Sequence, residues 1–413
     1  MSQSHWAIFI NNTSQKSNLI DSLLNGSRIK GFEALENLNG ALFSKSAIAR
    51  FIDEEDRHGT KVITEGVQQN LKSMSSGEQK KALLRTILAH EPDFIILDNP
   101  YDNLDVDAQE EMKVKLITIS KSTPIVQFLS RKKDVLPFTN IFFKLEEHRL
   151  SFINNAPSDI VPNKIGVFEG TVPSPLVSFD VENPILIDLR KVNVSYADKP
   201  ILKNIEWTIR KGEFWELRGK NGSGKTTILS MITGENPKGY GQELYIFGQR
   251  KGSGESVWEI KKRIGYFTPS MTDKFTGYHS VANMVISGLN DSIGLYLKPT
   301  ESQLRLAKEW LQLMELWQKK DTLFHDLSMG QKRLVMCVRA MIKHPPLLIL
   351  DEPTAGLDDA SAELFVALVN KFARESDTAI VFVSHRKEPG LEPDQIYHLT
   401  MTKEGSVGRV GHP

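Results

Sequence analysis

Residues 219–227 carry the strongest chemical signal in the sequence. They read Gly-Lys-Asn-Gly-Ser-Gly-Lys-Thr-Thr, which fits the pattern Gly-x-x-x-x-Gly-Lys-Ser/Thr of loops that hold phosphate groups. The apolar run 214–217 predicts a strand before the loop, and the run 228–232 predicts a helix after it. Backbone N–H groups of such a loop point at phosphate oxygens, and the positive end of the helix strengthens the attraction. The sequence therefore predicts a site for a nucleotide phosphate chain.

The side chains of this loop have distinct expected roles. Lys225 would place a positive charge at the terminal phosphates, and the Thr226 hydroxyl would bind Mg²⁺. A nucleotide with its Mg²⁺ is thus the predicted ligand. The other loop residues expected to contact the nucleotide are Gly219, Asn221, Gly222, Ser223, Gly224 and Thr227.

The bulk composition narrows the class of protein. A chain of 413 residues accommodates two or three domains. It contains 51 basic and 51 acidic residues, so no overall charge favours direct nucleic-acid binding. Its one cysteine excludes an internal disulfide. With no signal-peptide pattern and no apolar run near the ~18 residues of a membrane span, we expect a soluble, cytoplasmic protein, with peripheral attachment to the inner face of the plasma membrane left open.

An ordered set of motifs occurs twice along the chain. Residues 75–79 read Ser-Ser-Gly-Glu-Gln, and residues 328–331 read Ser-Met-Gly-Gln. Each stretch precedes an apolar-periodic helix and then a buried-strand run, which ends at Asp98 in the first copy and Asp351 in the second. From Ser75 to Asp105 the offset between the copies is a constant 253 residues. The sequence therefore contains two copies of one domain.

This set resembles the ATP-binding cassette (ABC) ATPases over nearly the whole chain, once per half. The resemblance implies an α/β fold: two P-loop NTPase (ABC-type) nucleotide-binding domains in tandem, each with a mixed sheet core and a small helical subdomain. The expected parts are a degenerate, truncated domain at 1–150, a Pro-containing linker at 151–183 and a complete ATPase domain at 184–413. Within this family, the chain resembles the tandem, permease-free proteins of the ModF or photorepair type, which are associated by name with molybdate transport. The resemblance rests on residues 252–255 and 291–294 and on Trp258.

The resemblance also implies roles for residues of the second half. Tyr196 would stack on adenine. Asp351 would hold Mg²⁺, with Thr226, while Glu352 would polarise the attacking water. His385, at the end of the predicted strand 380–384, would contact the γ-phosphate.

The first half departs from the pattern at nearly every one of these places. Ile10, Thr13 and Gln15 stand where the second half has Gly219, Gly222 and Gly224, although Lys16 and Ser17 remain. Side chains there would obstruct a phosphate cradle that needs glycine. The acidic residue after the buried strand is replaced by Asn99, which cannot act as a base. The terminal histidine is replaced by Arg131.

In the family the two cassettes close head to tail, and each ATP lies between the phosphate loop of one cassette and the signature sequence of the other. Residues 75–79 and 328–331 correspond to this signature. We therefore expect intramolecular pairing, with Ser75, Gly77 and Glu78 completing the site of the second half. The second composite site, formed by Lys16 with Ser328 and Gly330, should bind and hydrolyse ATP weakly or not at all. The alternative is that the first half has decayed and merely folds.

Three functions remain open for this predicted ATP hydrolase, in which MgATP hydrolysis opens and closes the two halves. It could be the ATP-binding subunit of a transporter, with a membrane permease on a separate chain. It could be a translation-associated tandem protein, or a regulatory or repair-associated switch. ABC ATPases usually carry a glutamine after the strand that matches 264–267, and here Thr-Pro-Ser follows. The missing glutamine argues against ordinary coupling to a permease.

Overall fold

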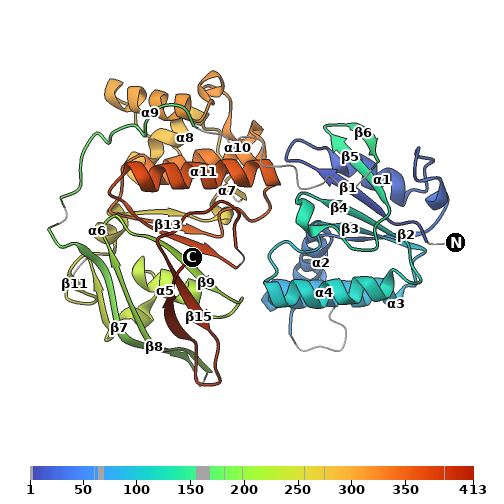
Figure 1. The fold of residues 1–413 in the computed structure, drawn as a ribbon, viewed down its shortest axis with the longest axis horizontal. Coiled ribbons are helices and arrows are strands. Elements are labelled where there is room, and N and C mark those ends of the chain that lie inside the picture. The colour runs from blue at the N-terminus through green and yellow to red at the C-terminus, as the bar shows by residue number, and fades with distance from the viewer. Residues whose placement is uncertain are drawn as a thin grey trace. The chain divides into compact units, whose positions relative to one another are not determined.

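The chain forms two compact units, each built around a layered α/β core (Figure 1). The computed structural model describes residues 3–59, 61–63, 69–154, 168–180, 182–197, 199–254, 256–273, 275–385 and 387–413. The first unit comprises residues 1–163 with 356–360, and the second comprises 164–355 with 361–413. Among the described residues, no helix combines the length and apolar character that crossing a membrane requires.

The first unit has one six-stranded sheet in the order β2-β3-β4-β1-β5-β6, parallel except for the β5–β6 pair. The strands are β1 (Trp6–Ile10), β2 (Gly40–Phe43), β3 (Phe94–Asp98), β4 (Ile125–Leu129), β5 (Ile141–Glu146) and β6 (Arg149–Ile153). The helices are α1 (Lys16–Leu24), α2 (Lys45–His58), α3 (Ser76–Ala89) and α4 (Val106–Ile119), with 3-10 turns at Glu33–Leu35, Leu71–Ser73 and Lys132–Asp134.

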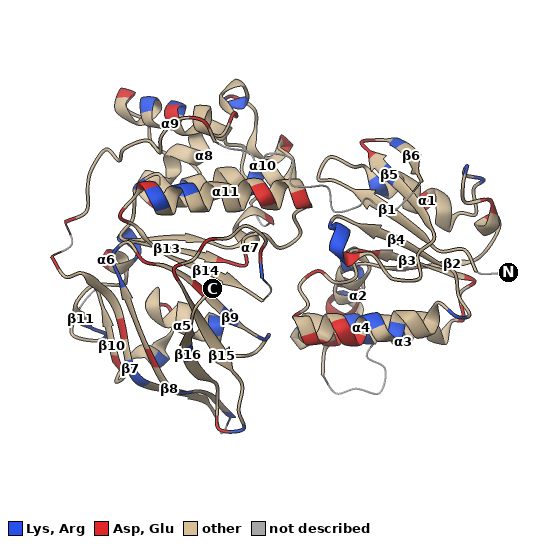
Figure 2. Cartoon of the chain, viewed as in Figure 1, with Lys and Arg blue, Asp and Glu red and all other residues tan. Residues whose placement is uncertain are grey.

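Both faces of this sheet are buried. Successive side chains of a strand point to opposite faces, and β3 shows the consequence: Ile95 and Leu97 pack with α2, α3 and α4, whereas Phe94 and Ile96 pack with α1. Figure 2 shows acidic and basic residues intermixed along α4. Such a helix is apolar toward the sheet and charged toward water.

The second unit has two sheets. The antiparallel sheet has the order β11-β10-β7-β8, and the mixed sheet has the order β12-β13-β14-β9-β15-β16. The antiparallel strands are β7 (Ile185–Tyr196), β8 (Lys199–Arg210), β10 (Glu243–Ile246) and β11 (Gln249–Arg250). The mixed-sheet strands are β9 (Phe214–Gly219), β12 (Ile264–Phe267), β13 (Leu347–Asp351), β14 (Ala379–Ser384), β15 (Gln395–Thr400) and β16 (Val407–Gly411).

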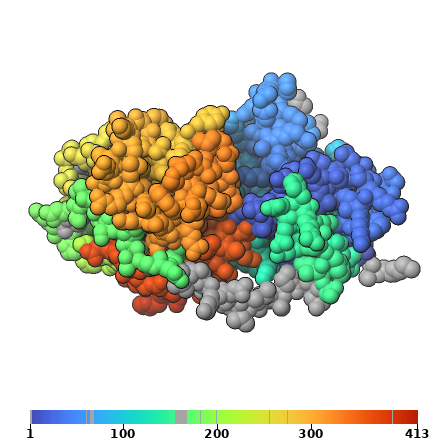
Figure 3. All heavy atoms as spheres, turned by 90° about the horizontal axis from the view of Figure 1, so that it is seen from above, coloured from blue at the N-terminus to red at the C-terminus, as the bar shows by residue number. Residues whose placement is uncertain are grey.

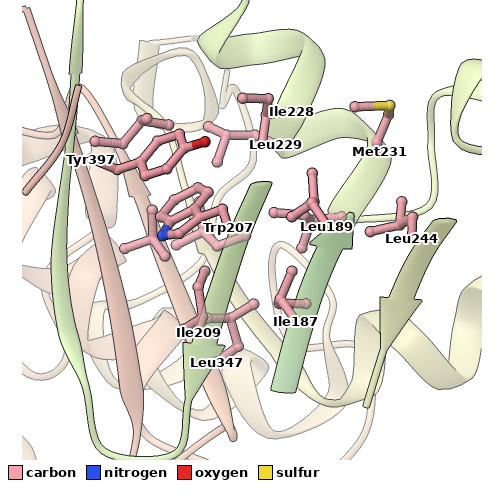
Figure 4. Packing of buried hydrophobic residues seen from close by; sticks show 14 of the residues in the cluster. Ile187, Leu189, Trp207, Ile209, Ile228, Leu229, Met231, Leu244, Leu347 and Tyr397 are labelled. Atoms are coloured by element: carbon pink, nitrogen blue, oxygen red, sulfur yellow. The ribbon is translucent and has the colours of Figure 1, made fainter. Parts of the chain in front are cut away.

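A single hydrophobic core joins these two sheets through α5 (Lys225–Ile232). Figure 4 shows Ile228, Leu229 and Met231 of this helix above side chains of both sheets. Trp207 of β8 stacks on Tyr397 of β15 with ring centroids 4.5 Å apart. The core therefore holds α5, and the loop before it, in a fixed position.

The remaining helices of the second unit are α6 (Val257–Lys262), α7 (Pro269–Asp273), α8 (Val281–Ser287), α9 (Glu301–Leu313), α10 (Met329–Met341) and α11 (Asp359–Glu375). Its 3-10 turns are Pro237–Gly239, Gly288–Asn290, Trp317–Lys319 and Phe324–Asp326. The region of α8, α9 and α10, yellow to orange, forms one continuous surface in Figure 3. A Cβ on Gly288 would lie 1.9 Å from the Arg339 carbonyl oxygen, so only glycine lets the end of α8 pack on α10.

The two copies share one topology, as the repeat predicts, and the α/β class with mixed sheets is confirmed. Two differences from the expectation stand out. Between β2 and α3 the described residues contain one α-helix, α2, so the helical subdomain of the first unit is much smaller than that of the second. Strand β6 is paired with β5 through Ile153, three residues beyond the expected domain end at 150. Residues 155–167 and 181 of the expected linker lie outside the described residues.

Candidate functional site

The glycine-rich loop connects the last residue of β9, Gly219, to the first residue of α5, Lys225. Gly222 has φ 79° and Gly224 has φ 91°, and this left-handed region disfavours other residues. A Cβ on Gly224 would lie 2.6 Å from Leu202 Cδ2. Both glycines are therefore required by the backbone, and the loop has the turn that a phosphate cradle needs.

The polar side chains of this loop are divided between buried and exposed. Lys225 is 7% exposed, and its Nζ donates to the carbonyls of Gly219 at 2.6 Å and Lys220 at 3.1 Å. The Ser223 hydroxyl is buried without a hydrogen-bond partner among the described residues. Asn221, Gly222 and Thr226 are exposed, and Thr227 is half-buried. A buried lysine and an orphaned hydroxyl fit a polar ligand such as a phosphate chain.

Asp351 ends β13, at the edge of the sheet where the phosphate loop begins. Burial, then the neighbouring Glu352 carboxylate, raises the pKa of Asp351 to about 6, while Lys225 acts in the opposite direction. The Tyr266 hydroxyl lies 3.5 Å from Asp351 Oδ2. A buried carboxylate that resists ionisation gains from a cation beside it, so the Asp351 side chain has the character of a Mg²⁺ ligand. Mg²⁺ usually needs only one or two protein ligands besides phosphate and water.

Glu352 and His385 are brought together by neighbouring parallel strands. Asp351 of β13 is in register with Val383 of β14, so the residues that follow the two strands meet at one edge. His385 Nδ1 lies 3.4 Å from Glu352 Oε1. The His385 side chain is 4% exposed, and neither of its ring nitrogens makes a hydrogen bond with a described residue. Such an imidazole has donor capacity left for a ligand.

Tyr196 lies at the end of β7 and is 43% exposed. Its hydroxyl accepts a hydrogen bond from Asn236 Nδ2 at 2.8 Å, and Asn236 also donates to Ser230 of α5. Lys238 Nζ lies 5.6 Å from the centre of the ring. These contacts fix the hydroxyl end beside α5 while much of the ring stays open to water.

The corresponding loop of the first unit has a different backbone. None of residues 10–17, all of which the structure describes, has a positive φ, and Gln15 before α1 has φ −91°. Lys16 Nζ lies 2.6 Å from Asp98 Oδ1, and the two form an ion pair. Asn99 Oδ1 accepts hydrogen bonds from the Ser130 N–H and hydroxyl, each at 3.0 Å. Lys16 and Asn99, which stand where the second unit has Lys225 and Glu352, are thus both engaged by other side chains.

Ser75 and Gly77 lie at the start of α3. The Ser75 hydroxyl accepts from the Glu78 N–H at 3.3 Å, and the Glu78 carboxylate accepts from the Ser75 N–H at 2.8 Å. Ser328 and Gln331 form the same reciprocal cap on α10. A Cβ on Gly77 would approach only Leu104 Cδ2, at an ordinary 3.8 Å, so packing in the first unit does not require glycine there.

Two residues near the site were missed by the sequence analysis, Tyr266 and Asn236. Tyr266 could have been found from strand order, because β12 lies beside β13 and its side chains reach the end of that strand. No sequence signal points to Asn236, because its contact with Tyr196 joins the end of β7 to the 3-10 turn after α5.

The chain is similar to known proteins over both halves. The protein family described as "ABC transporter" matches residues 202–355. The "ABC transporter ATP-binding protein ModF" of Escherichia coli (strain K12) is 37% identical over 363 residues, covering 84% of this chain and 73% of that protein. An uncharacterized ABC transporter ATP-binding protein of Schizosaccharomyces pombe is 28% identical over 334 residues, covering 77% of this chain and 66% of that protein.

Two solved structures have a similar fold over nearly the full length of this chain. The "RNase-L Inhibitor" has a TM-score of 0.60 at 15% identity and covers 98% of this chain and 85% of its own. An archaeal ribosome recycling factor, solved with the archaeal ribosomal stalk protein aP1, has a TM-score of 0.61 at 15% identity with the same coverage. At this identity the likeness concerns the fold alone.

Proposed function

The chain belongs to the family of ABC transporter ATP-binding proteins, which are ATPases, and we propose that it hydrolyses MgATP at one composite site, to drive opening and closing of its two halves. The observation that supports a single site is the contrast between the two phosphate loops. The second unit has left-handed glycines at positions 222 and 224, whereas residues 10–17 of the first have none. A loop without that turn cannot aim successive N–H groups at phosphate oxygens.

The proposed roles follow from the chemistry of phosphoryl transfer, in which positioning and charge neutralisation account for most of the catalysis. Lys225 neutralises the terminal phosphates, and Tyr196 stacks on the adenine. Bound Mg²⁺, held by Thr226 and Asp351, would neutralise charge on the phosphate oxygens.

Glu352 and His385 act on the reacting groups themselves. Glu352 accepts a hydrogen bond from the attacking water, and His385 donates one to the γ-phosphate. Their 3.4 Å separation supports a shared task, because the water and the phosphate it attacks must be adjacent.

The first unit would contribute its signature to the same site. In this proposal Ser75 and Gly77 present a hydroxyl and backbone N–H groups at the start of α3 to the γ-phosphate. The reciprocal cap between Ser75 and Glu78 supports this, because it fixes the first turn of the helix. A tether between the units makes closure intramolecular, at effective concentrations of roughly mM.

We propose two alternatives for the process that ATP hydrolysis drives. The first is a transporter-associated role, and the second is a regulatory, repair-associated or translation-associated role without a permease. The similarity to ModF supports the first. The second is favoured by β12, which is followed by Thr268 and the short helix α7 rather than by a glutamine that could report on a permease. Capture of partners by the Glu352→Gln variant in ATP separates them, since a membrane permease, a ribosome and neither are distinct outcomes.

MgATP hydrolysis by the purified full chain tests the proposed function directly. We expect turnover by the wild-type protein and none above background by the Glu352→Gln variant. Equal hydrolysis by the two proteins would contradict the proposed role of Glu352 and, with it, the proposed site.

A further inference from the structure

The loop that contains His385 is tied to the loop that contains Glu352 by a buried hydrogen bond. The Thr354 hydroxyl donates to Glu388 Oε1 at 2.8 Å, and the two residues are 3% and 2% exposed. Thr354 lies two residues after Glu352, and Glu388 lies three residues after His385. The bond therefore joins the two segments close to the proposed catalytic side chains.

A buried carboxylate in such a place needs a reason. Burying a charged group is unfavourable unless it is hydrogen-bonded, and a nonpolar residue would fill the same space at lower cost. Glu388 is one of few acidic side chains in the second unit with this degree of burial. Its contact with Thr354 thus suggests a function in geometry rather than in stability.

The same loop is also fixed from its other side. Asn370 of α11 is 6% exposed, and its Nδ2 donates to the Gly390 carbonyl at 2.7 Å. Its Oδ1 accepts from the Glu392 N–H at 3.1 Å. Glu388 is thus held by Thr354, and residues 390–392 are held by α11.

The first unit offers an internal comparison. Its topological counterparts of Thr354 and Glu388 are Tyr101 and Asp134, which follow β3 and β4 at matching positions. The Tyr101 hydroxyl is buried and has no hydrogen-bond partner among the described residues. A hydrogen bond matching that of Thr354 with Glu388 is therefore absent from the described part of the first unit. In that unit Asn99 and Arg131 stand in place of Glu352 and His385.

We propose that Thr354 and Glu388 are positioning residues that set the separation of His385 from Glu352 for ATP hydrolysis. This inference rests on the proposed function. Because the two side chains lie on separate loops, their distance depends on how those loops are held. A displacement of about 1 Å at a reacting centre can reduce a rate by about 100-fold.

The main test compares Thr354→Val with Thr354→Ser in the full chain. Valine keeps the shape of threonine but removes the hydroxyl, whereas serine keeps the hydroxyl. We expect Thr354→Val to reduce kcat by about 10-fold to 100-fold with KM for MgATP within about twofold of wild type. Thr354→Ser should recover most of kcat. This split separates positioning from a general loss of structure, which would change kcat and KM together.

Amide hydrogen exchange of residues 387–392 provides a second measurement that does not depend on activity. Exchange should be faster in Thr354→Val and close to wild type in Thr354→Ser. If Thr354→Val does not fold, the double variant Thr354→Val/Glu388→Leu replaces both partners by apolar groups, which is often nearly neutral for stability. It should fold and show the same loss of kcat.

A kcat within twofold of wild type for the folded Thr354→Val or double variant would overturn the inference. The Lys225→Ala variant in the same assay distinguishes a failure of the positioning role from a failure of the proposed function. If Lys225→Ala loses hydrolysis and Thr354→Val does not, only the positioning role is wrong. If Lys225→Ala hydrolyses ATP like the wild type, the proposed site is wrong and the positioning role falls with it.

Discussion

Lys16 Nζ lies 2.6 Å from Asp98 Oδ1 in the first unit, and this ion pair joins the lysine of the phosphate loop to the aspartate that ends β3. In the second unit the matching lysine, Lys225, donates instead to the carbonyls of Gly219 and Lys220. One lysine is thus engaged by a carboxylate and the other by its own loop. A phosphate would therefore have to compete with the Asp98 carboxylate for Lys16 in the first unit.

We first expect Lys225→Ala to abolish ATP hydrolysis and Lys16→Ala to leave most of it. Loss of Lys225 removes the positive charge proposed for the terminal phosphates, whereas Lys16 is already paired with Asp98. Steady-state phosphate release per folded chain is the measurement. Greater damage from Lys16→Ala would mean that the first unit holds the working site.

Glu352→Gln should trap ATP without hydrolysing it, at about one ATP per chain. The amide keeps the size of the side chain but cannot accept a proton from water. Bound nucleotide can be quantified after rapid desalting in Mg²⁺. A stoichiometry near two would show that the loop at residues 10–17 also binds ATP.

Ser75→Ala and Ser328→Ala form a matched pair. Each removes the same reciprocal helix cap, from α3 and α10 respectively, so each should cost about 1 kcal/mol of stability. Only Ser75 is proposed to contact the γ-phosphate, so only Ser75→Ala should also lower kcat, by about 10-fold or more. Thermal unfolding and ATPase assays on both variants measure the two effects. Equal kcat losses would argue against a composite site that uses only the first signature.

Gly222→Ala and Gly224→Ala test the phosphate loop. Both positions are left-handed, which costs alanine about 1–2 kcal/mol. A Cβ on Gly222 meets nothing within 4 Å, whereas a Cβ on Gly224 meets Leu202 at 2.6 Å. We expect Gly224→Ala to lower both the melting temperature and the MgATP affinity more than Gly222→Ala. A larger loss in Gly222→Ala than in Gly224→Ala would indicate that the side chains around Leu202 rearrange to accept the added methyl group.

The buried Lys80 should make the free energy of unfolding depend on pH. It is 6% exposed, its Nζ donates to the carbonyls of Pro100 and Asp102, and burial lowers its pKa to about 8. Between pH 8 and 10.5 the unfolded chain binds more protons at this residue than the folded chain, so the free energy of unfolding should rise with pH.

The size of this rise is at most about 3 kcal/mol. Lys80→Met lacks it, so the stability of the wild type relative to the variant should increase between pH 7.5 and 10. Urea unfolding of both proteins at several pH values measures the difference. A gap that stays constant would mean that Lys80 titrates alike in the folded and unfolded chains.

The fold followed from the sequence because its signals are local and repeated. The spacing of the two motif sets predicted two copies of one domain, and the six-stranded sheets of the two units indeed have the same strand order. The end of β6 at Ile153 could not be read from the sequence, because its pairing with β5, a contact between strands, decides where the strand ends. A small helical subdomain was expected in each half, but the sequence did not indicate that it would be smaller in the first unit than in the second.

The glycines at 219, 222 and 224, the acidic pair at 351–352 and the histidine at 385 were identifiable from residue type and order alone, because each type has few chemical equivalents at such a position. Their geometry was not. The approach of His385 to Glu352, the pairing of Lys16 with Asp98 and the bond from Thr354 to Glu388 join segments that are distant in sequence. Strand register and packing bring these segments together, and a linear pattern does not specify either one.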